Sequence, residues 1–215
     1  MEKERKFFKR DISWLSFNFR VLLEAQDESL PLFDRIRFLS IYSSNLEEFF
    51  RIRVSEYRHI IQQKETDEQE KQKAEETLNE INAVVEKQQL IYDRIFTEQI
   101  LPSLARNGIT LYQGGEILPV HEDFIRTYFD EEIFPYLQPV LILKDDSRSF
   151  LRDKRLYLII RLYKKTTQES DRQKPYYALI KIPYAKVPRF IELPNDGQQH
   201  YLMFVEELIA NNLPT

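Results

Sequence analysis

The first part of the chain places apolar residues at helical spacing. Leu15 and Leu22 lie seven residues apart. Trp14 and Val21 repeat the same spacing, so both pairs fall on one face of a helix. The polar stretch 27–31 ends in a proline and interrupts this pattern. The sequence therefore predicts one helix followed by a break.

A second apolar series follows the break. Pro31 suits the first turn of a helix, because no N–H is needed there. The apolar positions that share helical spacing include Leu32, Ile36, Leu39 and Ile41. Three short polar residues, 43–45, then interrupt the pattern. Ser44 with Glu47 fits a capping box, which predicts a new helix with Asn45 in its first turn.

The longest helical pattern covers residues 66–101. Residues 64–77 are highly charged, and we interpret them as an exposed helix face. The apolar positions that follow helical spacing are Ala74, Leu78, Ile81, Val85, Tyr92 and Ile95. Thr66 with Gln69 forms a candidate capping box at its start. About 35 residues at 1.5 Å each predict a helix of roughly 50 Å.

The pattern changes after Asn107 and Gly108, which together with Pro102 are expected to end this helix. Residues 109–112 form a short strand candidate, and residues 121–137 return to helical spacing. Further apolar runs predict strands at 156–163, 176–182, 188–193 and 200–204, and a last helix at 205–211. The second half of the chain is therefore a mixture of strands and helices.

These elements predict an α+β fold with two domains. Residues 1–106 are expected to form an antiparallel helical bundle with a long helix. Residues 107–215 are expected to form a partial α+β domain with a mostly antiparallel sheet. The polar stretch 164–174 is interpreted as a long hairpin loop, and 195–197 as a turn. Because no closing element follows the last helix, we expect a truncated chain.

Composition narrows the class of protein. The chain has 215 residues, of which 42% are hydrophobic and 13% aromatic, so a packed core is expected. The net charge of −4 gives no drive toward nucleic acid. The absence of cysteine excludes disulfides, thiolate nucleophiles and cysteine-based metal sites. Without a secretory signal or a run of about 18 apolar residues, a cytoplasmic location is expected.

No complete catalytic or metal-binding motif occurs. His59, His121 and His200 are far apart and lack metal-ligand spacing, so we expect surface or capping roles for them. Adjacent acids, as at 47–48 and 145–146, point in different directions and do not form a general acid/base pair. There is no phosphate-binding glycine-rich loop, and the chain holds only four glycines. We therefore assign no catalytic residue and no metal ligand.

Asn45 is the one candidate for a ligand contact. On pattern alone, a cap between two core helices is the better interpretation. The alternative is a polar group that faces a ligand. A helix N-terminus favours anions, but Glu47 and Glu48 would oppose a phosphate here. An asparagine amide carries both a donor and an acceptor, which suits the edge of an adenine.

Two motifs around this position resemble the N-terminal signature of the bacterial polyphosphate kinases of the first type. They are residues 10–18 (RDISWLSFN) and residues 38–54 (FLSIYSSNLEEFFRIRV). Residues 149–158 (SFLRDKRLYL) look like the start of that family's head domain. Residues 177–183 (YALIKIP) and 188–191 (PRFI) are similar to further head-domain strands. The resemblance covers nearly the whole chain.

The resemblance implies a phosphotransferase. The family reversibly moves the γ-phosphate of ATP onto inorganic polyphosphate through a phosphorylated histidine, with magnesium. It implies a helical N-terminal domain, a head domain, two C-terminal catalytic domains and a homo-oligomer, in the cytoplasm or at the inner face of the membrane. The catalytic residues belong to the C-terminal half, so none maps here. The segment alone is expected to be inactive.

The resemblance assigns one site residue to this chain. The family's N-terminal domain contributes an asparagine to nucleotide binding, and the matching position is Asn45. The family often has aspartate where this chain has Glu47, which leaves the motif intact. The alternative, from another class, is a stand-alone interaction module that binds a partner through the helix at 66–101.

Overall fold

The computed structural model describes residues 9–142, 151–163, 175–195 and 197–213. The chain divides into two compact units, Met1–Asn107 and Gly108–Thr215. The predicted loop at 164–174, the acidic pair at 145–146 and part of the turn at 195–197 lie outside the described residues. Each unit is described by itself below.

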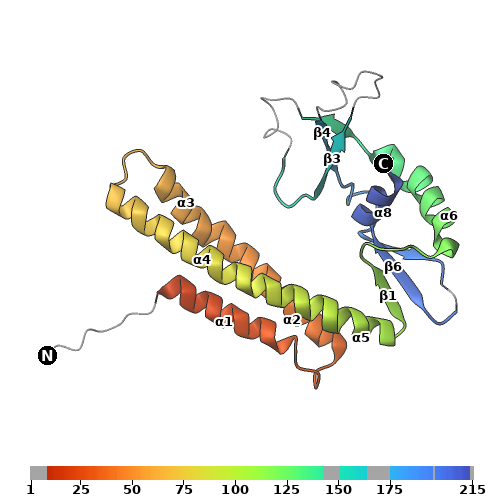
Figure 1. The fold of residues 1–215 in the computed structure, drawn as a ribbon, viewed down its shortest axis with the longest axis horizontal. Helices are drawn as coiled ribbons and strands as arrows, with labels where there is room; N and C mark the ends of the chain where they lie inside the picture. The colour runs from red at the N-terminus through yellow and green to blue at the C-terminus, as the bar shows by residue number, and fades with distance from the viewer. Residues whose placement is uncertain (1–8, 143–150, 164–174, 196, 214–215) are drawn as a thin grey trace. The chain divides into compact units, whose positions relative to one another are not determined.

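Unit 1 is a bundle of helices (Figure 1). Its α-helices are α1 (Arg10–Glu24), α2 (Leu32–Phe49), α3 (Ser55–Gln62), α4 (Glu68–Ile95) and α5 (Leu101–Arg106). A π-helical turn, Phe50–Val54, joins α2 to α3 without a break, and a second, Phe96–Ile100, joins α4 to α5. α1 packs against both α2 and α4, and α3 packs against α4. The predicted helical bundle with a long helix is confirmed.

The core of unit 1 lies where α1, α2 and α4 meet. Leu15 and Leu22 are fully buried, as their seven-residue spacing predicts. The other buried apolar residues of this core are Ala25, Leu39, Tyr42, Leu46, Phe49, Val54, Ile81, Val85, Ile95 and Ile100. Two amide side chains, Asn18 and Gln88, are buried among them. The core is therefore mainly apolar, with a few polar side chains buried inside it.

The predicted helix start at Ser44 is wrong. α2 runs without interruption from Leu32 to Phe49, so Asn45 lies in a helix interior. Ser43 and Ser44 are exposed, which means that they interrupt the apolar pattern only on the solvent face. The buried face continues past them through Tyr42 and Leu46. A helix tolerates short polar residues on its wet side when its other side is packed.

The expected ends of the long helix also need correction. Its cap is Asp67 and not Thr66, because the Asp67 carboxylate accepts a hydrogen bond from the Gln69 N–H at 3.2 Å. Pro102 does not end the helix, since it lies in the first turn of α5, directly after the π-helical turn. Because the helical run continues into α5, the missing N–H of Pro102 leaves one helical bond unmade, directly after the π-helical turn where the regular bonding pattern already changes. The helical run ends at Asn107.

In its described residues, unit 2 contains two small three-stranded sheets (Figure 1). Its α-helices and strands are β1 (Ile109–Tyr112), α6 (Pro119–Tyr128), β2 (Pro139–Leu141), β3 (Tyr157–Leu162), β4 (Tyr176–Lys181), β5 (Phe190–Leu193), β6 (His200–Phe204) and α8 (Val205–Asn212). A π-helical turn, Phe129–Ile133, and a 3-10 turn, Phe134–Tyr136, continue α6. The strand orders are β1-β6-β5 and β2-β4-β3. Among the described residues, all strand pairs are antiparallel except β1 with β6, whose register aligns Ile109 with His200. The predicted mostly antiparallel α+β fold is confirmed, whereas β2 was not predicted.

In unit 2, the prediction of a surface or capping role for His121 is wrong. His121 is fully buried and not a surface or capping residue. Its Nε2 lies 2.9 Å from the carbonyl oxygen of Pro194, which can only accept, so Nε2 carries the hydrogen. Its Nδ1 then accepts a hydrogen bond from the Tyr112 hydroxyl at 3.0 Å. His59 and His200 are exposed.

The buried polar interior of unit 1 allows a stability prediction. Gln88→Ala leaves the buried Tyr42 hydroxyl without its acceptor, which costs about 1–3 kcal/mol in the free energy of unfolding. Gln89→Ala, at the exposed neighbouring position, is the matched control and should leave stability nearly unchanged. Chemical denaturation of both variants measures the difference. Equal losses in the two variants would contradict the assigned role of Gln88.

Candidate functional site

The two helices of the quoted motifs meet at a pair of asparagine side chains. Nδ2 of Asn45, on α2, donates a hydrogen bond to Oδ1 of Asn18, on α1, at 2.9 Å. Nδ2 of Asn18 donates in turn to the main-chain carbonyl oxygen of Tyr42 at 3.1 Å. Asn18 is fully buried, while Asn45 is only partly buried. The amide of Asn45 therefore rests on a buried partner and reaches the surface.

This pair belongs to a longer series of hydrogen bonds between three helices. The Tyr42 hydroxyl donates to Oε1 of Gln88, on α4, at 3.1 Å. Nε2 of Gln88 donates to the main-chain carbonyl oxygen of Leu15, on α1, at 3.2 Å. Burial raises the pKa of Tyr42 to about 12, with a smaller contribution from Tyr92, so its hydroxyl remains a donor. The series thus links α1, α2 and α4.

A pocket of about 220 Å³ lies one helical turn away along both α1 and α2. Trp14 precedes Asn18 by four residues and Phe49 follows Asn45 by four, so each lies on the same helix face as its asparagine. The rings of Trp14 and Phe49 are stacked, with centroids 4.7 Å apart and planes within 10°. The pocket is lined by Arg10, Asp11, Trp14, Glu48, Phe49, Ile52 and Arg53. It offers a flat apolar wall with a charged rim.

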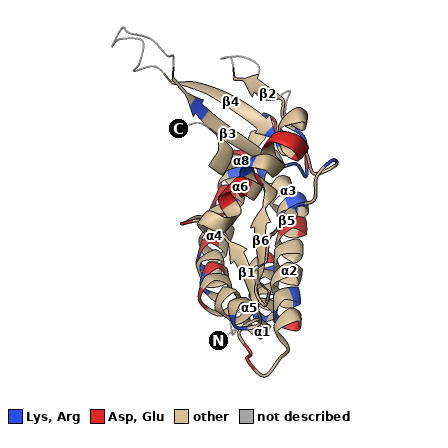
Figure 2. Cartoon of the chain, turned by 90° about the vertical axis from the view of Figure 1, so that its right-hand side faces the viewer, with Lys and Arg blue, Asp and Glu red and all other residues tan. Residues whose placement is uncertain are grey.

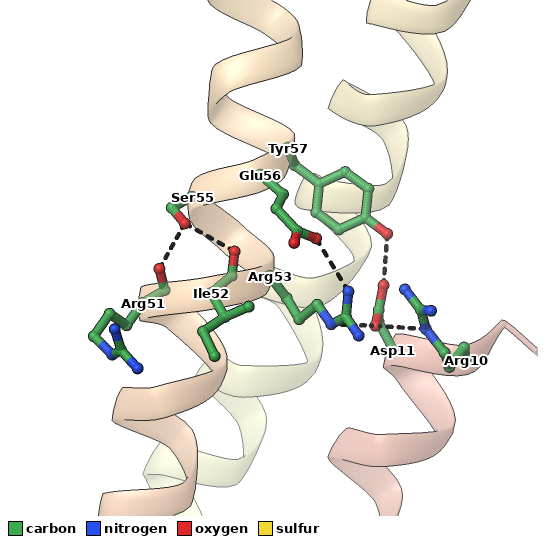
Figure 3. Close-up of polar contacts among 8 residues, drawn as sticks. All are labelled: Arg10, Asp11, Arg51, Ile52, Arg53, Ser55, Glu56 and Tyr57. Carbon is green, nitrogen blue, oxygen red and sulfur yellow. Dashed lines mark hydrogen bonds and ion pairs between the residues drawn. The ribbon is translucent and has the colours of Figure 1, made fainter.

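A nearly buried carboxylate organises the rim of this pocket (Figure 3). Asp11 is 7% exposed, and its Oδ2 accepts a hydrogen bond from the Tyr57 hydroxyl at 2.5 Å. Its Oδ1 lies 3.5 Å from Nε of Arg10 and 3.9 Å from Nε of Arg53. Burial, and then the hydrogen bond and charge of Asp11, raise the pKa of Tyr57 to about 12. Tyr57 therefore stays protonated and holds Asp11 in place.

The arginines around the pocket already have acidic partners. Arg51 pairs with Glu48. Arg53 donates to Glu56 at 3.1 Å (Figure 3). On the helices of unit 1, basic and acidic residues are interspersed in the view of Figure 2 and do not gather by sign. A phosphate would therefore have to displace carboxylates from these arginines. The site is better suited to a neutral, planar group than to a polyanion.

The π-helical turn between α2 and α3 supplies part of the pocket wall. The Ser55 hydroxyl lies 2.6 Å from the carbonyl oxygen of Arg51 and 2.8 Å from that of Ile52, and its one hydrogen is shared between them (Figure 3). These bonds satisfy carbonyl groups where the regular helical pattern changes. The turn carries Ile52 and Arg53, both of which line the pocket. Such turns inside helices are frequent at functional sites.

Sequence reasoning identified Asn45 but not its partner. Asn18 lies in the first quoted motif, three residues after Leu15 and four before Leu22, on the buried face of α1. A polar residue at a core-facing position is a signal that could have identified it. Among the described residues, no group of three or more His, Asp or Glu side chains is placed to hold a metal ion. In the same part of the chain, no helix combines the length and apolar character of a membrane span.

Family models match both halves of the chain. Residues 7–112 match the polyphosphate kinase N-terminal domain, and residues 120–215 match the polyphosphate kinase middle domain. The two matches together cover most of the chain and include the Asn18–Asn45 pair and the neighbouring pocket.

Individual relatives agree with these matches. The chain is 37% identical over 207 residues to a polyphosphate kinase of Bacillus anthracis, covering 94% of this chain and 29% of that protein. It is 36% identical over 199 residues to the polyphosphate kinase of Escherichia coli K12, covering 92% and 28%. The crystal structure of polyphosphate kinase from Porphyromonas gingivalis matches with a TM-score of 0.84 and 42% identity, over 98% of this chain and 30% of that one. The chain thus spans less than a third of the length of these relatives, and it belongs to the polyphosphate kinase family.

Proposed function

We propose that this chain is the nucleotide-contacting N-terminal portion of an enzyme that makes inorganic polyphosphate from ATP. In this proposal residues 1–106 form the helical domain and residues 107–215 form part of the head domain. Catalytic domains outside this chain carry the phosphorylated histidine and the Mg²⁺. The protein works as a homo-oligomer in the cytoplasm or at the inner face of the membrane. The observation that carries the proposal is the outward-facing amide of Asn45, which lies in a family motif.

The amide of Asn45 has hydrogen-bonding capacity to spare. Within the part of the chain that the structure describes, its Oδ1 has no hydrogen-bond partner, and only one of its two N–H groups is bonded. It can therefore offer one acceptor and one donor to a ligand. An adenine edge presents the complementary donor and acceptor. We propose that Asn45 contacts the base of ATP.

The phosphates are better placed elsewhere, as expected from the acidic residues next to Asn45. The expected helix N-terminus at Asn45 does not exist, so its effect on anions no longer applies. The acidic residues remain the reason, because Glu48 and Glu56 already pair with Arg51 and Arg53. Phosphoryl transfer needs cations aimed at the reacting oxygens. We propose that these cations, and the Mg²⁺, are held by the catalytic domains.

The histidines of this chain are poor candidates for the phosphorylated residue. His121 is fully buried and uses both ring nitrogens in hydrogen bonds. The ring of His59 pairs with Gln63 and that of His200 with Glu192. A carboxylate next to His200 would repel an incoming phosphate. The proposed intermediate therefore belongs to a histidine outside this chain.

The alternative function, an interaction module built on the long helix, has less support. Such a module needs an exposed apolar stripe for a partner. The stripe of α4 is buried inside unit 1, through Ala74, Ile81, Val85 and Ile95. Among the described residues of α4, Leu90 is the large apolar residue that remains exposed. One isolated apolar residue is ordinary on a protein surface.

The activity is testable on the protein at its full genomic length. Incubated with ATP and Mg²⁺, it should form chains of inorganic polyphosphate, and a metal chelator should stop the reaction. Residues 1–215 alone should form none. Gel electrophoresis, with digestion by a polyphosphatase as the control, measures the product. A folded full-length protein that makes no polyphosphate would overturn the proposed reaction.

The role of Asn45 predicts a kinetic effect. In the full-length protein, Asn45→Ala removes the proposed contacts to the base, so the KM for ATP should rise by about threefold to tenfold. The melting temperature should also fall, because the buried Oδ1 of Asn18 loses this donor, whereas a purely structural role does not predict the rise in KM. Ser43→Ala, at an exposed position of the same helix, is the control. A lower melting temperature with an unchanged KM would favour a purely structural role.

A further inference from the structure

The orientation of the Asn18 amide follows from one main-chain group. The carbonyl oxygen of Tyr42 can only accept a hydrogen bond, and it lies 3.1 Å from the Asn18 side chain. Asn18 must therefore direct its NH₂ group toward Tyr42. Its carbonyl oxygen Oδ1 then faces the opposite way, toward Asn45. Because Asn18 is fully buried, no water can replace either bond without opening the helix pair.

The orientation of Asn45 follows from that of Asn18. At 2.9 Å from the Asn18 oxygen, Asn45 must present an N–H, since two oxygens at that distance would repel each other. Its own Oδ1 is therefore fixed away from Asn18. A free surface asparagine would exchange its oxygen and nitrogen by rotation, but this one has a single favourable orientation.

We infer that Asn18 is a positioning residue that fixes the Asn45 amide in one orientation and thereby favours adenine over guanine nucleotides. The inference rests on the proposed contact between Asn45 and the base. The outward Oδ1 accepts from the exocyclic amine of adenine. Guanine has a carbonyl oxygen at the same ring position, which would face Oδ1 without a hydrogen between them. Specificity then depends on a residue that does not touch the ligand.

The first test replaces Asn18 in the full-length protein. Asn18→Leu has nearly the same size but cannot hold the Asn45 amide. The KM for ATP should rise by about threefold to tenfold. The preference for ATP over GTP, measured as the ratio of kcat/KM values, should fall by about fivefold or more. An unchanged preference in a folded Asn18→Leu protein would overturn the inference.

A conservative variant separates positioning from packing. In Asn18→Asp, burial favours the protonated acid, which can donate to the Tyr42 carbonyl and still accept from Asn45. This variant should keep the nucleotide preference even if its melting temperature falls. Loss of the preference to the level of Asn18→Leu would contradict the role. The variant also keeps the test decisive if Asn18→Leu does not fold.

Tyr42→Phe is the matched control for stability. It removes the hydroxyl that donates to Gln88 but retains the main-chain carbonyl that orients Asn18. The melting temperature should fall, while the KM for ATP and the nucleotide preference stay unchanged. If Tyr42→Phe changed the preference as much as Asn18→Leu, general loosening of the helices would explain both, and the inference would fail.

The double variant distinguishes the two proposals from each other. If Asn18 acts through Asn45, then Asn18→Leu combined with Asn45→Ala should have the same KM as Asn45→Ala alone. Additive effects would show that Asn18 acts independently, which overturns the inference. If Asn45→Ala raises the KM but Asn18→Leu does not, only the positioning role is wrong. If Asn45→Ala itself leaves the KM unchanged, the proposed contact with the base is wrong. The positioning role of Asn18, which depends on that contact, is then wrong as well.

Discussion

The hydrogen bonds buried between α1, α2 and α4 are the constraint on which the helical unit depends. Asn18 binds the main chain of α2, the Tyr42 hydroxyl binds Gln88 on α4, and Gln88 binds the main chain of α1 at Leu15. Each bond contributes only about 1 kcal/mol, yet each buried group left unpaired costs about 1–3 kcal/mol. A shift of any of these helices by one residue would leave several groups unpaired. The network therefore determines how α1, α2 and α4 align along one another more than it adds to the free energy of unfolding.

The same constraint explains how the surface amide of Asn45 is held in place at the proposed ligand site. A side chain on a loop loses conformational entropy when it binds. Asn45 instead stands on a rigid helix, with its amide fixed by Asn18 before any ligand arrives. The neighbouring pocket is built in the same way, because Tyr57 and two arginines hold the buried carboxylate of Asp11. Positions fixed in this way support a function better than their own hydrogen-bond energies indicate.

Sequence patterns predicted the helical bundle because periodic burial is encoded locally. Leu15 and Leu22 are buried as their spacing requires. The capping box at Ser44 failed because a local motif cannot reveal that the packed face of α2 continues past it. The π-helical turns could not be predicted from the apolar periodicity, since they change the hydrogen bonding without changing the residue types. The short strand β2 has only three residues and begins with a proline, so it carries little pattern of its own.

The two asparagines of the candidate site also differ in whether the sequence could identify them. Asn45 was accessible to sequence reasoning because it lies in a quoted motif between two apolar stretches. Asn18 was not, because its role depends on a contact between residues 27 positions apart. A polar residue on a core-facing position indicates that some partner exists, but it does not identify that partner. The three-dimensional structure supplies the missing step, and the chemistry then leaves one assignment: a carbonyl that can only accept orients Asn18, and Asn18 orients Asn45.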